Sequence, residues 1–172
     1  HLTKACISNV ALEVGKLGWH AVLTPARKKN SGTSGGTGFL FRSFLADNFA
    51  KEHEVFHGQA FTATLWHLKG TEIVVAVAYL ETAPAQPTQA NLQHIKELGA
   101  VLRMLGKHFL LVGDFNMPPE ALQSTCWAQQ LHAHIFAGNN VTCTAGFGRE
   151  LDYIVASAQL APLLRDLGLH PD

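Results

Sequence analysis

One short stretch, Leu110 to Pro118, constrains the fold more than any other part of the chain. The run His108 to Val112 is short, apolar and bounded by turn formers, which predicts a buried strand. Asp114 and Asn116 follow where this strand ends, and the carboxyl ends of strands are the usual place for a site in a layered α/β protein. If the strand geometry continues through Phe115, both polar side chains point the same way and could hold a metal-bound water, a phosphate or both.

The same residues have a second interpretation. Gly-Asp followed by Asn and Pro is also typical of a plain turn. The stretch alone does not decide between a turn and a functional site, so the rest of the chain has to decide.

The remaining sequence alternates strands with amphipathic helices. Apolar residues spaced by three or four predict helices from Leu2 to Leu17 and from Leu92 to Leu105, and Pro at a first helical turn predicts a short helix from Pro119 to Trp127. Strands are expected at Trp19–Thr24, Thr37–Phe41, Gln59–Leu68, Thr71–Tyr79, Leu131–Phe136 and Glu150–Ser157, with a short edge strand in Asp47–His57 and a short helix or loop after Pro162. The third and fourth of these strands form a hairpin. No composition break divides the 172 residues, so residues 1–172 are expected to form a single domain.

Charge and cysteine content restrict the partners. The 13 basic and 13 acidic residues cancel, so any contact with nucleic acid must come from a local patch. Arg27, Lys28 and Lys29 form such a patch in a Gly- and Ser-rich stretch, which we expect to be a flexible loop that either contacts phosphates or is a solvated linker. Three widely spaced cysteines argue against a disulfide framework and favour an intracellular, reducing compartment over secretion. No apolar run is long enough to cross a bilayer, so no membrane partner is expected.

Two further polar residues stand at or in apolar runs. Tyr79 closes one predicted strand and is either an aromatic residue at the edge of the core or part of a site. Asp152 lies within another, where a charge is costly unless it is paired. It is therefore either a water-facing residue of an edge strand or a buried acid that orients another polar group.

Four ordered motifs resemble the endonuclease/exonuclease/phosphatase superfamily, most of all its retroelement and abasic-site repair endonucleases. The motifs are Gly35-Gly36-Thr37-Gly38-Phe39-Leu40-Phe41, Val77-Ala78-Tyr79, Leu111-Val112-Gly113-Asp114-Phe115-Asn116 and Glu150-Leu151-Asp152-Tyr153-Ile154-Val155-Ala156-Ser157. The resemblance implies a four-layer α/β sandwich, in which two packed, mostly antiparallel sheets are flanked by helices.

The resemblance also implies roles for four residues. Asp114 would position or deprotonate the attacking water and coordinate a metal, while Asn116 and Tyr79 would contact the scissile phosphate. Asp152 would set the tautomer of a catalytic His. The implied cofactor is Mg²⁺, with Mn²⁺ as the alternative, because hard cations suit carboxylate ligands.

The family pattern is not complete within this sequence. A metal-binding Glu is expected before His1, and an Asp-His pair on a last strand is expected after Asp172, so we interpret the sequence as a piece of the domain that is incomplete at both termini and weak or inactive by itself. The leading hypothesis is a metal-dependent DNA endonuclease of retroelement type that acts as a monomer, with DNA favoured over RNA. The alternatives are a phosphatase of the same superfamily acting on small or lipid phosphoesters, and a decayed copy that does not cleave.

Overall fold

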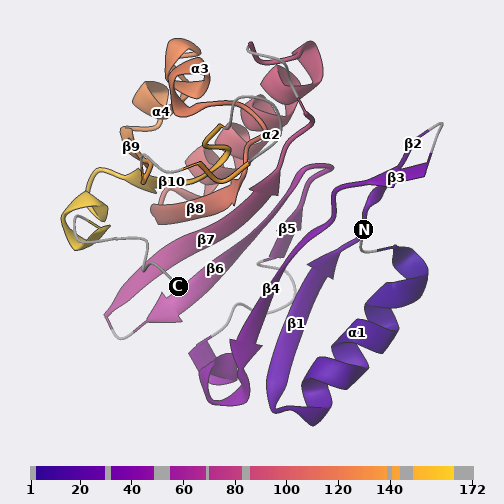
Figure 1. Cartoon of the computed structure of the whole chain (residues 1–172). Helices are drawn as coiled ribbons and strands as arrows, with labels where there is room; N and C mark the ends of the chain where they lie inside the picture. Colours follow the sequence, from indigo (N-terminus) through magenta and orange to yellow (C-terminus); the bar gives the residue numbers. More distant parts are fainter. Residues whose placement is uncertain are drawn as a thin grey trace.

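The predicted strand Thr71–Tyr79, which is rich in β-branched residues, lies in the interior of the main sheet. The computed structural model describes residues 3–29, 32–48, 55–68, 70–82, 86–138, 141–143 and 149–164, which form a mixed α/β fold around a six-stranded sheet (Figure 1). Its strands, in spatial order, are β5 (Val55–His57), β6 (Phe61–Leu68), β7 (Thr71–Tyr79), β8 (His108–Asp114), β10 (Asp152–Ser157) and β9 (Ala133–Phe136). β7 and β8 run parallel, because a helix carries the chain back across the sheet between them. The other neighbours in this sheet are antiparallel.

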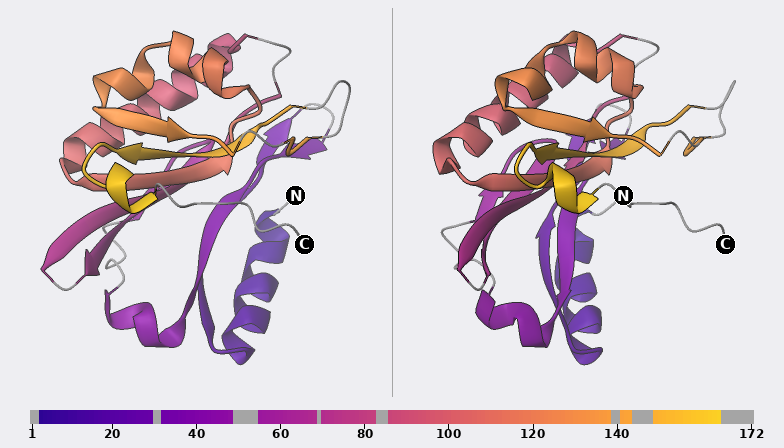
Figure 2. Two further views of the ribbon diagram at one scale, coloured as in Figure 1. Left: turned by 60° about the vertical axis from the view of Figure 1, so that its left-hand side comes forward. Right: turned by 90° about the vertical axis from the view of Figure 1, so that its left-hand side faces the viewer.

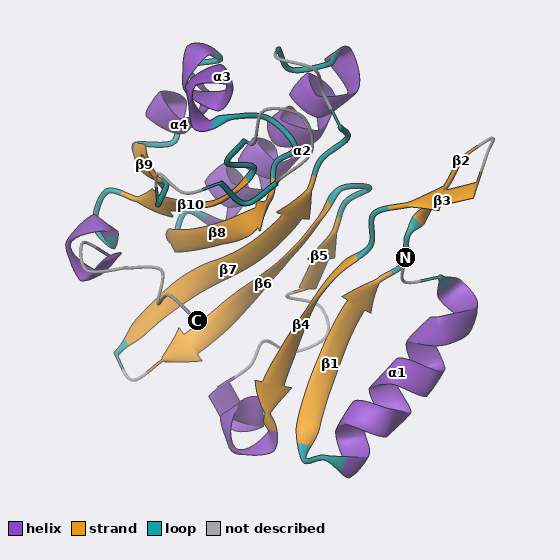
Figure 3. Cartoon of the chain, viewed as in Figure 1, coloured by secondary structure: helices purple, strands orange, loops and turns teal. Residues whose placement is uncertain are grey.

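Helices cover one face of this sheet. They are α2 (Gln89–Leu105), which makes the crossover from β7 to β8, α3 (Pro119–Ser124) and α4 (Trp127–Gln130) (Figure 3). Thr88 caps α2 by accepting a hydrogen bond from the Asn91 main-chain N–H, and Gly106 ends the helix in the left-handed conformation. The apolar side chains between these helices and the sheet form the core, for example Leu98 of α2 and Leu111 of β8.

The opposite face of the six-stranded sheet carries a small second sheet. β1 (Trp19–Thr24) and β4 (Thr37–Arg42) pair antiparallel along their length, and α1 (Lys4–Lys16) packs on β1 (Figure 2). Thr37 of β4 bonds to the hydroxyl of Thr62 on β6 at 2.7 Å. Since successive side chains of a strand point to opposite faces, and the neighbours of Thr62 in β6 belong to the core under α2, the small sheet lies on the face away from α2.

Most of the predicted strands and the predicted hairpin are confirmed. The hairpin β6–β7 forms as predicted, and the part of the Asp47–His57 stretch that the structure describes contains β5 at the edge of the sheet. The pairing of β1 with β4 was not predicted from the sequence. A mixed α/β fold with a mostly antiparallel sheet is therefore confirmed, whereas the four-layer arrangement and the single domain stay predictions.

The flexible loop predicted for residues 27–36 is wrong. Arg27–Lys29 forms β2 and Gly32–Ser34 forms β3, and the two pair antiparallel as a short hairpin. Gly35 and Gly36 both have positive φ, so the chain leaves the hairpin through a conformation that only glycine adopts freely. The Gly- and Ser-rich composition marked these chain reversals rather than a disordered linker.

The helix predicted from Leu2 to Leu17 is confirmed as α1, whereas the helix predicted from Pro119 to Trp127 needs correction. α1 forms over Lys4–Lys16, but none of its described residues is fully buried, and Leu12 and Leu17 are 61% and 71% exposed. The helix expected at Pro119–Trp127 is two helices, because Cys126 has positive φ and interrupts it. After Pro162 the described chain has only a short 3₁₀ turn, Ala161–Leu164. Among the described helices, none is long and apolar enough to cross a membrane.

Candidate active site

Strand register places three of the predicted site residues in one row. Tyr79 on β7 is the Cα partner of Asp114 on β8, and Asp114 is the partner of Asp152 on β10. Partner residues on neighbouring strands point to the same face of a sheet. That face is the one away from α2, because the alternate residues of these strands, such as Ala78 and Tyr153, belong to the core. An aromatic hydroxyl and two carboxylates from three strands therefore share one edge of the molecule.

Gly113 makes this row possible. A Cβ at position 113 would lie 2.3 Å from the carbonyl oxygen of Ala78, its partner on β7. Real Cβ atoms essentially never approach an atom so closely. β8 can pair with β7 at this point only because residue 113 has no side chain. The glycine of the Gly-Asp motif thus sets the distance between Tyr79 and Asp114.

Asn116 lies beside Asp114 for a reason other than the one predicted. β8 ends at Asp114, and Asn116 has φ +50°, so the expectation that strand geometry continues through Phe115 is wrong. Instead the Asn116 main-chain N–H donates to Asp114 Oδ1 at 2.9 Å, closing a tight turn. The turn and the site are therefore the same structure, and the turn is what brings the carboxamide to the carboxylate.

The Asn116 carboxamide is nearly buried and is held at both ends. It is 6% exposed, its Nδ2 donates to the carbonyl oxygen of Leu80 at 3.0 Å, and its Oδ1 accepts from Thr82 Oγ1 at 3.4 Å. These partners fix which end of the carboxamide is the donor. One of the two Nδ2 hydrogens is used by Leu80, and no other acceptor for Nδ2 is found among the residues that the structure describes, so the second hydrogen is available for a ligand.

The surroundings of Asp114 disfavour its charge. Burial raises the pKa of the Asp114 carboxyl, the hydrogen bond from the Asn116 main chain partly offsets this, and the neighbouring Asp152 carboxylate raises the pKa further. A half-buried acid next to a second acid is an arrangement typical of functional sites.

Asp152 matches neither of the two predicted alternatives. β10 lies between β8 and β9, so it is not an edge strand, yet Asp152 is exposed at its first residue and is not a buried acid. Its main-chain N–H donates to Thr142 Oγ1 at 3.1 Å. Solvent at the strand end is what makes its charge tolerable.

Tyr79 is half-buried under the connection between β3 and β4. A Cβ at Gly35 would lie 3.3 Å from the Tyr79 ring, and Gly35 has φ +81°. Because residue 35 has no side chain, the chain can pass over the ring of Tyr79 at this point.

The predicted basic patch of Arg27, Lys28 and Lys29 is not a single exposed surface, because Arg27 and Lys28 differ in exposure. Arg27 is turned into the protein, with Nη1 3.3 Å from Glu81 Oε1 and 2.6 Å from His94 Nε2 on α2, and its side chain is only 14% exposed. Lys28 is exposed and lines a hollow of about 940 Å³ together with Thr24 and His57, among others. The side chain of Lys29 lies outside the described part of the structure.

Sequence reasoning missed Glu81 and Thr82, in the loop after β7, and Asn91, on the first turn of α2, which support the site. Asn91 bonds to the main chain of Glu81 through both ends of its carboxamide. The one available signal was Thr88 followed three residues later by a polar residue ahead of an apolar helical stripe, which is typical of a helix start but says nothing of the loop before it.

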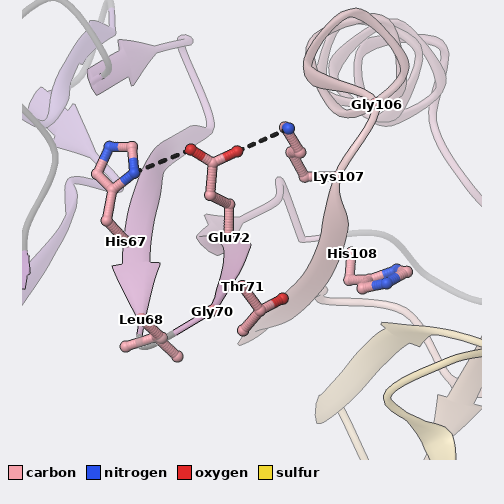
Figure 4. Close-up of a pocket in the computed structure, with 8 residues that line it drawn as sticks. All are labelled: His67, Leu68, Gly70, Thr71, Glu72, Gly106, Lys107 and His108. Carbon is pink, nitrogen blue, oxygen red and sulfur yellow. Dashed lines mark ion pairs between the residues drawn. The ribbon is translucent and has the colours of Figure 1, made fainter.

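A second hollow, of about 550 Å³, lies at the opposite edge of the sheet, where β7 begins (Figure 4). There Glu72 forms ion pairs with Lys107 at 2.6 Å and with His67 at 3.0 Å, and Lys107 lowers the pKa of the Glu72 carboxyl. The Glu72 carboxylate is paired with cations and open to solvent, so this hollow lacks the half-buried acid that the row of Tyr79, Asp114 and Asp152 provides.

The carboxylates at the row suit one kind of metal. The described residues contain no group of three or more His, Cys, Asp or Glu side chains that could enclose an ion. Mg²⁺ is commonly held by one or two carboxylates together with water and substrate phosphates. Asp114 and Asp152 repel each other, and a bound cation would offset their negative charge. The residues therefore fit Mg²⁺ and not a closed structural metal site.

Comparison with known proteins identifies the family. The profile of the endonuclease/exonuclease/phosphatase family matches residues 7–172. The chain belongs to this family. No curated protein matches it at the sequence level.

Solved structures of other members share the fold. The chain is similar to the catalytic domain of human nocturnin, with TM-score 0.61 and 14% identity over 87% of this chain and 64% of that one. It is similar to the endonuclease domain of TRAS1, a telomere-specific non-LTR retrotransposon, with TM-score 0.55 and 13% identity over 94% and 83%. A mannosyl-6-phosphatase from Bacteroides thetaiotaomicron gives TM-score 0.59 and 13% identity over 88% and 68%. The chain thus spans less than two thirds of the nocturnin domain, and identities this low establish the fold alone.

Proposed function

We propose that this family member is a metal-dependent phosphodiester hydrolase and, within that class, a DNA endonuclease of retroelement type. The observation that carries the proposal is the row Tyr79, Asp114 and Asp152 with Asn116 turned in beside it. A hydroxyl and an amide donor next to a carboxylate form a site that can hold a phosphate and activate a water against it.

Each side chain has a step that its surroundings support. Asp114, whose pKa is raised by burial, accepts a proton from the attacking water. The second Nδ2 hydrogen of Asn116 and the hydroxyl of Tyr79 donate to the non-bridging phosphate oxygens, where negative charge grows in the transition state. Asp152 is exposed in the same row. As the family resemblance implies, it would accept a hydrogen bond from the ring of the family's catalytic His and set the tautomer of that ring.

Asp114 is the residue that would hold Mg²⁺ or Mn²⁺, with Asp152 next to it. When bound, the cation supplies Lewis-acid stabilisation of charge on the phosphate. We also propose the four-layer arrangement, in which β1–β4 forms part of the second sheet and α1 its outer layer, for a monomeric domain. The three free cysteines, all at least partly exposed, support an intracellular, reducing address.

Two observations support a DNA substrate. The TRAS1 endonuclease domain is similar to this chain over more of its length than nocturnin or the mannosyl-6-phosphatase. In addition, Lys28 presents an exposed positive charge at the hollow of about 940 Å³ that it lines. The balance of charge favours the second candidate, a phosphatase acting on small phosphoesters. The net charge is zero and Arg27 is engaged by Glu81, so little free positive charge remains for a long polyanion.

Cleavage and binding assays on the protein with its native flanking residues test the proposal. Supercoiled plasmid should be nicked with Mg²⁺ and not with EDTA. Asp114→Asn should lower the rate by ~10²–10⁴-fold, the usual contribution of a positioned acid or base, and leave DNA binding within about twofold. Glu97→Gln removes one carboxylate from α2, which covers the other face of the sheet, and serves as the matched control.

Release of phosphate from small phosphoesters without plasmid nicking would favour the phosphatase. If Asp114→Asn lowered turnover by less than about threefold, the role given to Asp114 would be wrong.

A further inference from the structure

The loop that follows β7 is held by one buried side chain. Asn91, on the first turn of α2, is fully buried. Its Oδ1 accepts from the Glu81 main-chain N–H at 2.8 Å, and its Nδ2 donates to the Glu81 carbonyl oxygen at 2.8 Å. A single carboxamide thus satisfies both main-chain groups of one loop residue, which fixes the position and the direction of the chain there.

The residues on either side of Glu81 hold the Asn116 carboxamide. Leu80 accepts from Asn116 Nδ2 through its carbonyl oxygen, and Thr82 donates to Asn116 Oδ1 through its hydroxyl. The Leu80 N–H also donates to the carbonyl oxygen of Asp114 at 2.9 Å. The orientation of the Asn116 carboxamide therefore depends on where residues 80 and 82 lie.

We propose that Asn91 is a positioning residue of the site. It fixes Glu81, and through Leu80 and Thr82 it aims the remaining Asn116 N–H at the phosphate. This inference rests on the proposed function, because it assigns a phosphate contact to Asn116.

The second anchor of the loop cannot replace Asn91. Arg27 contacts the carboxylate of Glu81, not its main chain, across 3.3 Å. If Asn91 is removed, the Glu81 N–H and C=O lose the two hydrogen bonds that the carboxamide supplies, and this part-buried main chain shifts to find other partners. Small misplacements of a group that acts on the transition state cost rate far more than binding.

The first test needs no activity. Nuclear magnetic resonance follows solvent exchange of the Asn116 side-chain N–H that bonds to Leu80, in Asn91→Ala and in Leu98→Ala. Leu98 is buried in the same helix, and its apolar side chain cannot form a hydrogen bond with the loop. Its truncation therefore controls for loss of stability. We expect exchange at least tenfold faster in Asn91→Ala than in Leu98→Ala, even though Leu98→Ala lowers the unfolding midpoint as far or further. Equal exchange in the two variants overturns the proposal.

The second test uses phosphodiester hydrolysis. Asn91→Ala should lower kcat at least tenfold with KM within about threefold, and it should have no further effect in an Asn116→Ala background, because the two act as one unit. Independent, multiplicative losses overturn the proposal. If the unmodified protein hydrolyses no phosphodiester, the proposed function fails, and the exchange measurement still decides whether Asn91 orients Asn116.

Discussion

Replacing Gly113 by Ala should destabilise the protein strongly, although it adds a single methyl group. The new Cβ would meet the Ala78 carbonyl oxygen at 2.3 Å and the Ala78 carbonyl carbon and nitrogen at 3.0 Å each. All three are main-chain atoms of the paired strand β7, so no side-chain rotation relieves the overlap. β7 and β8, which end at Tyr79 and Asp114, therefore have to separate.

The size of the effect follows from the kind of clash. Overpacking a well-packed site costs typically 1–3 kcal/mol, and contact with main chain places this case at the upper end, about 3 kcal/mol. For a protein of this length, 1 kcal/mol shifts the melting temperature by roughly 2–4 °C, so a decrease of about 6–12 °C is expected. Urea unfolding followed by circular dichroism measures the free energy directly.

Gly15→Ala is the matched control. Nothing lies within 4 Å of a Cβ at Gly15, and this glycine is inside α1. The same substitution should therefore stabilise the protein, by up to about 1 kcal/mol, because Ala favours helix. A Gly113→Ala variant within about 0.5 kcal/mol of the parent would refute the argument that this glycine sets the spacing of β7 and β8.

Two more predictions concern charge. The pKa of Asp114 is raised above its unfolded value of 3.8, so the folded protein binds that proton more tightly than the unfolded chain does. The ionised carboxylate therefore destabilises the fold at pH values above its folded pKa, and the penalty disappears as pH falls below 3.8. In EDTA, Asp114→Asn should be more stable than the parent at pH 7 and equal to it near pH 3, as urea unfolding at the two pH values will show. A variant that is less stable at pH 7 would contradict this. Lys28→Gln should reduce the slope of log binding constant against log salt for duplex DNA by about one, whereas Lys96→Gln, an exposed lysine on α2, should leave it unchanged. Equal slopes in both variants would mean that Lys28 makes no phosphate contact.

The elements of the fold were largely predictable, because their periodicities are strong. β7 is a β-branched run and α2 carries an unbroken apolar stripe, and both appear where expected. Pairing was not predictable in the same way. Nothing local in Glu150–Ser157 indicates that it inserts between β8 and β9, since strand order is decided by long-range contacts. The strand that contains Asp152 is therefore predicted correctly, but the residue lies neither on an edge strand nor buried, since it is exposed at the end of an interior strand.

The site was predictable as a set of residues and not as a geometry. The sequence indicates four residues because each follows, closes or interrupts an apolar run, and the structure brings these four to one edge: Asp114, Asn116, Tyr79 and Asp152. Charge alone indicates Lys28 together with Arg27, but the Arg27 side chain bonds inward. Composition records how many charges a segment has, but the direction of a side chain depends on partners, here Glu81 and His94, that lie far away in the sequence.

Several local features that are costly for stability converge on the edge where this site lies. Asn116 adopts positive φ without being glycine, Asp114 is half-buried with a raised pKa beside Asp152, and Gly113 gives up a side chain inside a strand. Each feature costs free energy by itself, and a chain selected only for folding would remove such costs by ordinary substitutions. Their concentration within four consecutive residues, Gly113 to Asn116, is expected where local stability is exchanged for a fixed arrangement of a carboxylate and a carboxamide. The hollow at the opposite edge shows the contrast, because its Glu72 lies between Lys107 and His67 and its pKa is lowered rather than raised. The two carboxyl groups thus differ in surroundings, since cations offset the charge of Glu72, whereas burial and a second acid disfavour the charge of Asp114, which is the situation expected of an acid that takes up a cation or a proton in the proposed function.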